Sequence, residues 1–280
     1  MLKSLERLVR NALAEDIGQE DITTNRTVPE DARCEARLIA KQDGVLSGIV
    51  VFRTAFDCLH ADITEWGAMA DGARFSRSDE IASFTGNTRA ILTAERVAMN
   101  FIQHLSGVAT QTATFVEAVK GLNVKICDTR KTTPLMRRLE KQAVVDGGGT
   151  NHRHTLFNGI VIKENHIVAA GGVRSAVQKA LDGTHHLMKV EVEVTSLDEF
   201  KEALEAGADV IMLDNMTLDD MQEAAHRVQG KRVVLEASGN MTLQRIRSIA
   251  EAGVHVISVG SLTHSAPIVD LSLIIQNASN

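Results

Sequence analysis

Charged and glycine-containing segments follow six short apolar runs in the second half of this sequence. The runs are VKICD (124–128), GIVIK (159–163), KVEVEV (189–194), DVIML (209–213), RVVLEA (232–237) and HVISV (255–259). The groups in or just after them include Arg130, Lys131, Lys163, Glu193 and Asp214. Arginine and lysine bind small polyanions such as dicarboxylates, whereas carboxylates bind ribose hydroxyls or a Mg²⁺ ion attached to phosphates. The pattern therefore predicts a site for an acidic small molecule and a phosphorylated sugar.

Two further features support this prediction. The basic cluster gains His152 and Arg153 from the segment NHRH, although the whole chain carries a formal charge of −6. Ser238-Gly239 and Gly260 precede helical stretches, where free backbone N–H groups bind phosphate. A metal is a weaker alternative for NHRH, because His152 and His154 do not have zinc-ligand spacing. The glycines at 147–149 are equally compatible with a plain flexible loop.

The elements that must position these residues are parallel strands. The six runs alternate with amphipathic stretches such as SLDEFKEALEAGA, which is typical of βαβ units. EAGADVIMLDN at 205–215 resembles EAGVHVISVG at 251–260, and this repeat favours a β/α barrel over a doubly wound sheet. The C-terminal strand ends of a barrel meet at one mouth, where barrel enzymes place their catalytic groups.

The first third of the chain has a different pattern. Residues 1–16 have helical apolar spacing, and short runs up to about residue 86 predict a small α/β region with antiparallel strands. A long helical pattern then covers 88–120. It is interrupted at Ser106-Gly107, and we expect the domain change inside it.

Composition excludes several classes of protein. The negative charge argues against nucleic-acid or anionic-membrane binding, and 3% aromatic residues cannot supply base-stacking platforms. The three cysteines form no C-x-x-C pair, and no run of 18 apolar residues exists. We therefore expect a cytoplasmic protein.

Several segments together resemble one family over nearly the whole chain. They are LAEDIGQEDITT, ERVAMNFIQHLSGVAT, CDTRKTTP, LEKQAVVDGGGTNHR, IVIKENHI, VEVEV, IMLDN, LEASGN and VISVGSLTHSAP. In these segments the chain resembles the quinolinate phosphoribosyltransferases. The combination of DTRKTTP with GGGxNHR is specific to this family.

The resemblance implies the type II phosphoribosyltransferase fold. An N-terminal α/β sandwich (1–105) precedes an open seven-stranded β/α barrel (106–265), and a C-terminal helix (266–280) packs back on the first domain. It also implies a homodimer with shared active sites, in which Arg96 serves the neighbouring subunit; a higher homo-oligomer stays open.

The implied reaction joins quinolinate to phosphoribosyl pyrophosphate (PRPP) and yields nicotinate mononucleotide, pyrophosphate and CO₂, with Mg²⁺ as cofactor. Lys131, Lys163, Glu193 and Asp214 would be the catalytic residues, with Glu193 and Asp214 reaching Mg²⁺ through substrate and water. The quinolinate carboxylates would be oriented by Arg96, Arg130, His152, Arg153 and Lys163. Lys131 and Lys163 would reach either quinolinate or pyrophosphate, and Thr129 would also bind substrate. The 5′-phosphate would be held by Ser238, Gly239, Asn240, Ser258, Val259 and Gly260.

Two positions depart from the family pattern. Asn240 and Leu135 stand where glycines are usual. Asparagine tolerates left-handed backbone conformations, so the phosphate turn survives in our interpretation. Two alternatives remain: a related phosphoribosyltransferase for another aromatic acid, and a catalytically silent binding protein.

Overall fold

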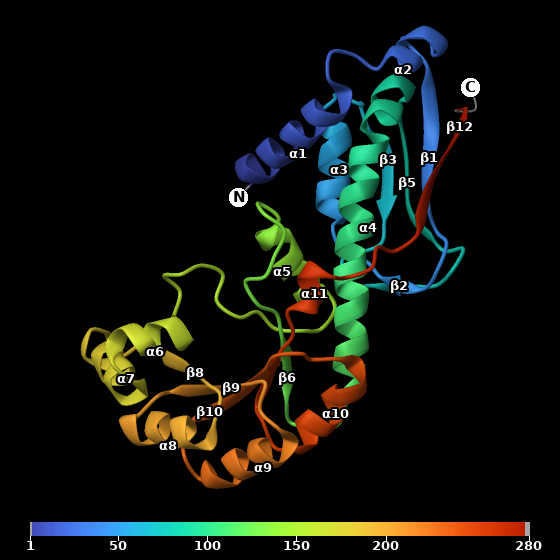
Figure 1. The fold of residues 1–280 in the computed structure, drawn as a ribbon. Coiled ribbons are helices and arrows are strands. Elements are labelled where there is room, and N and C mark those ends of the chain that lie inside the picture. The colour runs from blue at the N-terminus through green and yellow to red at the C-terminus, as the bar shows by residue number, and fades with distance from the viewer. Residues whose placement is uncertain (1, 278–280) are drawn as a thin grey trace. The chain divides into compact units, whose positions relative to one another are not determined.

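The computed structural model describes residues 2–277, which divide into two compact units (Figure 1). The first unit comprises Met1–Gln111, Pro134–Gly148 and Ala266–Asn280, and the second comprises Thr112–Thr133 and Gly149–Ser265. Among the described residues, no helix has both the length and the apolar character needed to cross a bilayer.

The first unit is built on a four-stranded antiparallel sheet in the order β12-β1-β5-β3. In β1, Cys34, Ala36, Leu38 and Ala40 alternate with more exposed residues and are buried, as expected for a half-buried strand. Its elements are α1 (Leu2–Ile17), α2 (Ile22–Thr27), β1 (Arg33–Ala40), β2 (Gly44–Val45), α3 (Ile49–Asp57), β3 (Thr64–Ala68), β4 (Arg74–Phe75), β5 (Glu80–Asn87), α4 (Thr88–Ala118, which continues into the second unit), α5 (Arg137–Asp146) and β12 (Leu271–Asn277).

The C-terminal segment is a strand, so the predicted C-terminal helix is wrong. β12 pairs with β1 over seven residues, from Leu271 opposite Ala40 to Asn277 opposite Cys34. Leu271, Leu273 and Ile275 recur with the period of a strand, and they complete a sheet in which β1 would otherwise be an edge. The segment does belong to the first unit.

Helix α4 runs through Ser106-Gly107 without the predicted interruption. Ser106 Oγ accepts a hydrogen bond from Ser47 N at 3.1 Å and donates one to Ser47 O at 3.2 Å. A Cβ on Gly107 would lie 2.1 Å from the carbonyl oxygen of Pro267. These two small residues therefore let other segments approach the helix closely, and they do not end it.

Residues 134–148, which we had placed in the barrel, belong to the first unit. They contain α5, in which Glu140 and Lys141 are completely buried. The Oε1 atom of Glu140 lies 2.8 Å from Nε2 of His104 on α4. This partly buried polar contact joins α5 to α4.

The second unit contains a six-stranded parallel sheet in the order β6-β11-β10-β9-β8-β7. Beside β6, an isolated parallel bridge joins Cys127 to Thr150, and the described residues of this sheet form six strands where the resemblance implies seven. The strands are β6 (Lys125–Cys127), β7 (Ile160–Ile162), β8 (Val190–Val194), β9 (Val210–Asp214), β10 (Val234–Ser238) and β11 (Val256–Ser258).

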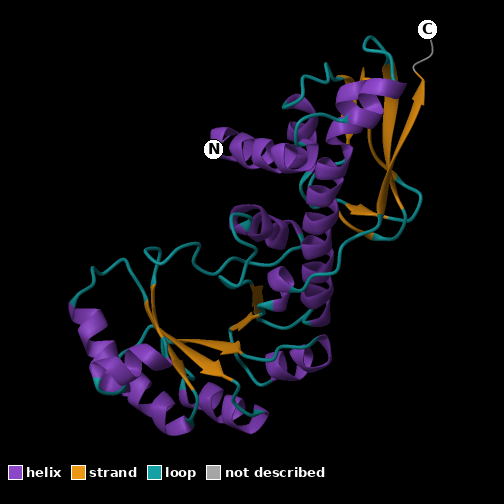
Figure 2. Ribbon diagram, turned by 45° about the horizontal axis from the view of Figure 1, so that its top comes forward, coloured by secondary structure: helices purple, strands orange, loops and turns teal. Residues whose placement is uncertain are grey.

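Helices α7 to α10 lie along one face of this sheet (Figure 2). Side-chain caps begin two of the unit's helices: Ser196 accepts from the N–H of Glu199, and Thr217 from that of Asp220. The helices are α6 (Glu164–Ala170), α7 (Val173–Asp182), α8 (Leu197–Ala206), α9 (Leu218–Arg227), α10 (Leu243–Glu251) and α11 (Ser261–His264).

Candidate active site

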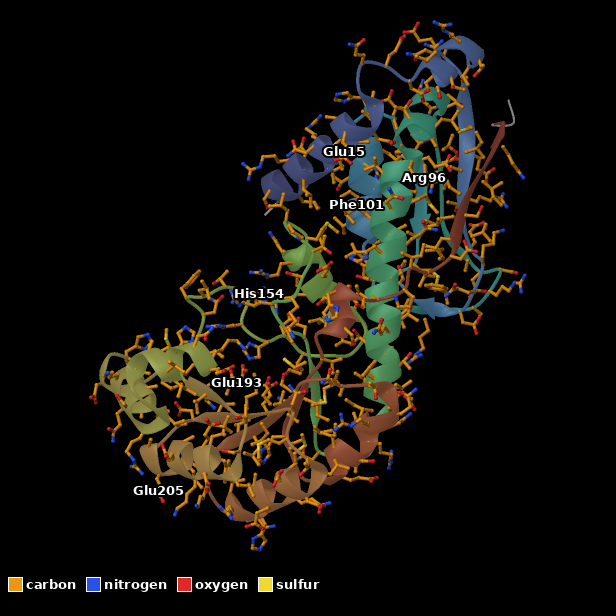
Figure 3. All side chains as sticks on the ribbon, viewed as in Figure 1. Glu15, Arg96, Phe101, His154, Glu193 and Glu205 are labelled. Atoms are coloured by element: carbon orange, nitrogen blue, oxygen red, sulfur yellow. The ribbon has the colours of Figure 1, made fainter. Side chains whose placement is uncertain are left out.

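Polar residues gather where the parallel strands of the second unit end. Lys163 follows β7, Glu193 lies in β8, and Asp214 is the last residue of β9. Because parallel strands share a direction, their carboxyl ends form one edge of the sheet. Lys163 Nζ donates to Glu193 Oε2, so two of the predicted catalytic residues form an ion pair. Figure 3 labels Glu193 at this sheet.

Asp128, just after β6, organises the segment 151–153. It is completely buried. Its Oδ1 accepts from the backbone N–H of His152 at 2.9 Å, and its Oδ2 accepts from Asn151 Nδ2 at 2.6 Å. In the sequence it is the last residue of the run VKICD. Through these two hydrogen bonds Asp128 holds the neighbouring loop.

Arg153 is a partly buried cation with an unsatisfied donor. Its Nη1 donates to the carbonyl of Gly159 at 2.7 Å, whereas its buried Nε has no hydrogen-bond partner among the described residues. Burial, and to a lesser degree the charge of Arg130, lower the pKa of Arg153. Two guanidinium groups thus lie close enough to repel each other, and an anion bound there would relieve the repulsion.

Two buried glutamates, Glu191 and Glu236, lie close to the ring of His152. His152 Nε2 lies 3.0 Å from Oε2 of Glu191 and 3.9 Å from Oε1 of Glu236. Burial, followed by the charge of Glu191, raises the pKa of Glu236 to about 7. Period-two alternation in the run KVEVEV is consistent with Glu191 lying on the same face as Glu193, but burial of the group with His152 has no signal in the sequence.

The predicted phosphate turn has the expected backbone. Gly239 and Asn240 have φ of 87° and 47°, and Asn215 in the preceding strand-end turn has φ of 54°. Asn215 links the two turns, because its Nδ2 donates to Asp214 Oδ2 at 3.0 Å and its Oδ1 accepts from Asn240 Nδ2 at 2.9 Å. The structure therefore joins the carboxylate of Asp214 to the turn that contains Gly239 and Asn240.

Lys131 lies beside the second glycine turn. Its backbone N–H donates to Thr129 Oγ1 at 3.0 Å, and its carbonyl accepts from Thr263 Oγ1 at 2.7 Å. A Cβ built on Gly260 would lie 3.1 Å from Cδ of Lys131, so glycine allows this close approach. Ser258 and Val259, which precede the glycine, are both buried.

Arg96 is the one predicted site residue in the first unit. It is exposed on α4, as Figure 3 shows. The remaining predicted residues belong to the second unit: Thr129, Arg130, Lys131, His152, Arg153, Lys163, Glu193, Asp214, Ser238, Gly239, Asn240, Ser258, Val259 and Gly260.

Comparison with known proteins relates most of the chain to one protein family. Residues 21–106 match the model of the quinolinate phosphoribosyl transferase N-terminal domain, and residues 108–274 match that of the C-terminal domain. The chain belongs to the quinolinate phosphoribosyl transferase family.

Individual relatives cover almost the whole chain. A probable nicotinate-nucleotide pyrophosphorylase (carboxylating) of Bacillus subtilis is 40% identical over 269 residues, which are 96% of this chain and 92% of the relative. The structure of the nicotinate-nucleotide pyrophosphorylase from Francisella tularensis is 42% identical, has a TM-score of 0.92, and is matched over 98% of this chain and 96% of that one. NadC from Streptococcus pyogenes is 40% identical, with a TM-score of 0.94 and coverage of 100% and 99%.

Family membership confirms the fold and the family expected from the motifs. The two residues that stand where the family usually has glycine both lie at positive φ: 47° at Asn240 and 65° at Leu135. Asparagine adopts this conformation more readily than most residues, whereas leucine is strained by it. In the quinolinate phosphoribosyl transferase fold, Leu135 therefore keeps a backbone conformation that would suit glycine.

Proposed function

We propose that this protein transfers the phosphoribosyl group of PRPP to quinolinate and removes one carboxylate, giving nicotinate mononucleotide, pyrophosphate and CO₂. Such a reaction would contribute to NAD biosynthesis in the cytoplasm. The observation that carries the proposal is the unsatisfied, partly buried Arg153 beside Arg130, in a chain whose relatives are named for this chemistry. A dianionic pyridine dicarboxylate would give the Arg153 Nε a hydrogen-bond acceptor and place negative charge beside the two guanidinium groups.

The acidic strand ends fit the sugar half of the reaction. As the bond from C1′ of ribose to pyrophosphate lengthens, positive charge develops on the ribose. Glu193 and Asp214 lie on neighbouring strands, and carboxylates there stabilise that charge. The pyridine nitrogen of quinolinate then bonds to C1′, and pyrophosphate leaves with the electron pair of the broken bond.

For decarboxylation the protein needs chiefly to hold the two carboxylates of the substrate in position. Once the nitrogen carries the ribose it is cationic, so the bond to the adjacent carboxylate can break to release CO₂ and leave a carbanion that the nitrogen stabilises. That carbon then takes up a proton. The task of Arg130, Arg153 and Lys163 is to orient the two carboxylates and keep water away.

Mg²⁺ fits the acidic pair in an indirect role. Oxygen donors are those that Mg²⁺ prefers, and it usually keeps several waters and binds substrate phosphates. Glu193 already pairs with Lys163, and Asp214 accepts from Asn215. This supports a metal held mainly by pyrophosphate and water, whose charge would neutralise the leaving group.

The decisive experiment is an assay of the purified protein with PRPP, Mg²⁺ and quinolinate, measuring pyrophosphate and CO₂. We expect both products in equal amounts. Pyrophosphate release with another aromatic acid and none with quinolinate would indicate the related phosphoribosyltransferase. No turnover with any acid, despite binding, would indicate the silent binding protein.

Our proposal includes a homodimer in which Arg96 completes the partner's site. The exposed position of Arg96 in the first unit supports it. Inactive Arg96→Ala and inactive Lys131→Ala subunits, mixed and allowed to exchange, should form heterodimers with one intact site and regain activity. Heterodimers that stay inactive would contradict shared sites.

A further inference from the structure

The buried group formed by His152, Glu191 and Glu236 has no role in the reaction described above. Glu191 is 7% exposed and Glu236 is 4% exposed, and the Oε1 atom of each has no hydrogen-bond partner among the described residues. One ligand atom from each of the three residues lies within 4.8 Å of the others. Two ionised carboxylates buried so closely would repel each other, so the group needs a proton or a cation.

The histidine ring distinguishes between these two possibilities. The backbone N–H of Arg153 donates to His152 Nδ1 at 2.8 Å, so Nδ1 carries a lone pair. In the neutral ring Nε2 must then hold the hydrogen, which it donates to Glu191 Oε2 at 3.0 Å. A metal at Nε2 would require the hydrogen on Nδ1, where it would face the N–H of Arg153. The geometry therefore favours a proton.

The groups facing Glu236 indicate where that proton lies. Glu191 faces it from β8, His152 from the loop after Thr150, Ser258 from β11, and Lys163 from the end of β7. Burial and Glu191 favour its neutral form, while the other three favour its ionised form to a smaller extent. Glu191 accepts from His152 and acts as the carboxylate of the pair.

We propose that Glu191 and Glu236 are positioning residues, with Glu236 a neutral acid and Glu191 the carboxylate that fixes the ring of His152. The ring in turn holds the backbone N–H of Arg153, and Asp128 holds the backbone N–H of His152. Arg153 is thus presented to substrate from a buried support. In this arrangement His152 acts through Arg153 and does not contact quinolinate. The kinetic part of this inference rests on the proposed function.

The first test uses isotope-labelled histidine and needs no substrate. Long-range ¹H–¹⁵N spectra of wild type, assigned with His152→Gln, should show His152 at pH 7 as the neutral tautomer with hydrogen on Nε2. Glu236→Gln should keep this tautomer, because its amide has the shape of the neutral acid. A hydrogen on Nδ1 would overturn the proposal. So would stoichiometric Mn²⁺ or Zn²⁺ binding, without PRPP, that perturbs His152 and is lost in Glu236→Gln.

The second test is the pH dependence of thermal unfolding. A carboxyl group whose pKa is raised by folding contributes stability below its unfolded pKa, and that contribution is lost as pH rises through the folded value. Wild type should therefore lose Tm relative to Glu236→Gln between about pH 4.5 and pH 7, with no further divergence above. A constant Tm difference over this range would contradict a neutral Glu236.

The third test separates positioning from a merely structural role. Replacing the Glu191 carboxylate by the Glu191→Gln amide weakens a charge-assisted hydrogen bond, and we expect KM for quinolinate to rise about 5-fold with little change in kcat. Glu236→Gln should keep both constants within about 2-fold. The control is Glu202→Gln on the exposed side of α8, which should change nothing.

The spectra and the Tm curves can contradict the inference independently of the kinetic constants. If quinolinate is not a substrate, the spectra and the Tm curves still report on the buried group. If the tautomer is as expected but Glu191→Gln leaves KM for quinolinate unchanged, the group is structural and the positioning role is wrong.

Discussion

Adding one methyl group at Gly239 should damage the phosphate turn more than the fold. Gly239 has φ of 87°, and a Cβ there would lie 2.4 Å from Cγ and Oδ1 of Asn215. Contacts this short do not occur, so the Asn215 side chain must rotate away. It then loses its hydrogen bonds to Asp214 and Asn240, at 3.0 and 2.9 Å. Gly239→Ala thus uncouples Asp214, the carboxylate that we propose for the ribose, from the turn.

The expected size follows from these two bonds. Each hydrogen bond contributes about 0.5–1.5 kcal/mol, and somewhat more when a carboxylate accepts it. Losing both of these exposed hydrogen bonds costs about 1–3 kcal/mol. If roughly half of this, about 0.5–1.5 kcal/mol, is lost from PRPP binding, KM for PRPP rises about 2- to 12-fold, since a tenfold change equals about 1.4 kcal/mol. KM for quinolinate should change much less.

The matched control is Gly230→Ala. Gly230 also has positive φ, 75°, but nothing lies within 4 Å of an added Cβ. Both variants carry a backbone strain of about 1–2 kcal/mol, so only the contact with Asn215 distinguishes them. Saturation curves for PRPP, with Mg²⁺ and quinolinate in excess, should be altered in Gly239→Ala alone. An unchanged PRPP curve in Gly239→Ala would refute the assignment of this turn to the 5′-phosphate.

Three other changes have definite expected results. Arg153→Ala, and likewise Lys163→Ala, should raise KM for quinolinate about 10- to 150-fold, the value of a lost charge-assisted hydrogen bond, and affect PRPP much less in paired saturation curves. Leu135→Gly should stabilise the protein by about 1 kcal/mol in chemical unfolding, because Leu135 is 85% exposed with φ of 65°; a loss of stability would show that its side chain matters. Gly107→Ala should cost about 1–3 kcal/mol despite alanine's better helix propensity, because its Cβ would meet Pro267; a raised Tm would contradict this.

Much of the fold could be predicted because it depends on periodic patterns. The six parallel strands and the antiparallel first unit follow from alternation and from strand–helix rhythm. Two errors have one cause: tertiary contacts decide what local pattern leaves open. Ser106-Gly107 resembles a helix end, yet it is a close-packing point within α4. Residues 271–277 are a strand because β1 offers them a free edge.

The site was predictable at the level of residue types and strand ends, and less so at the level of contacts. The pairing of Lys163 with Glu193 follows from neighbouring parallel strands. Burial of Glu236 beside Glu191 depends on which side chains fill the interior of the curved sheet, and no local pattern specifies that. The contact between this buried pair and the ring of His152 could therefore not be predicted from the sequence.

The pairing of β12 with β1 has a consequence for synthesis on the ribosome. Strand β1 is made early and finds β5 soon afterwards, but its other edge waits for residues 271–277. All of the second unit is translated in the interval. A nascent chain, or one truncated before residue 271, therefore exposes a long unpaired strand edge of the kind that recruits other chains. Synthesis of residues 271–277 and protection of this strand edge from aggregation are therefore the same event for the first unit.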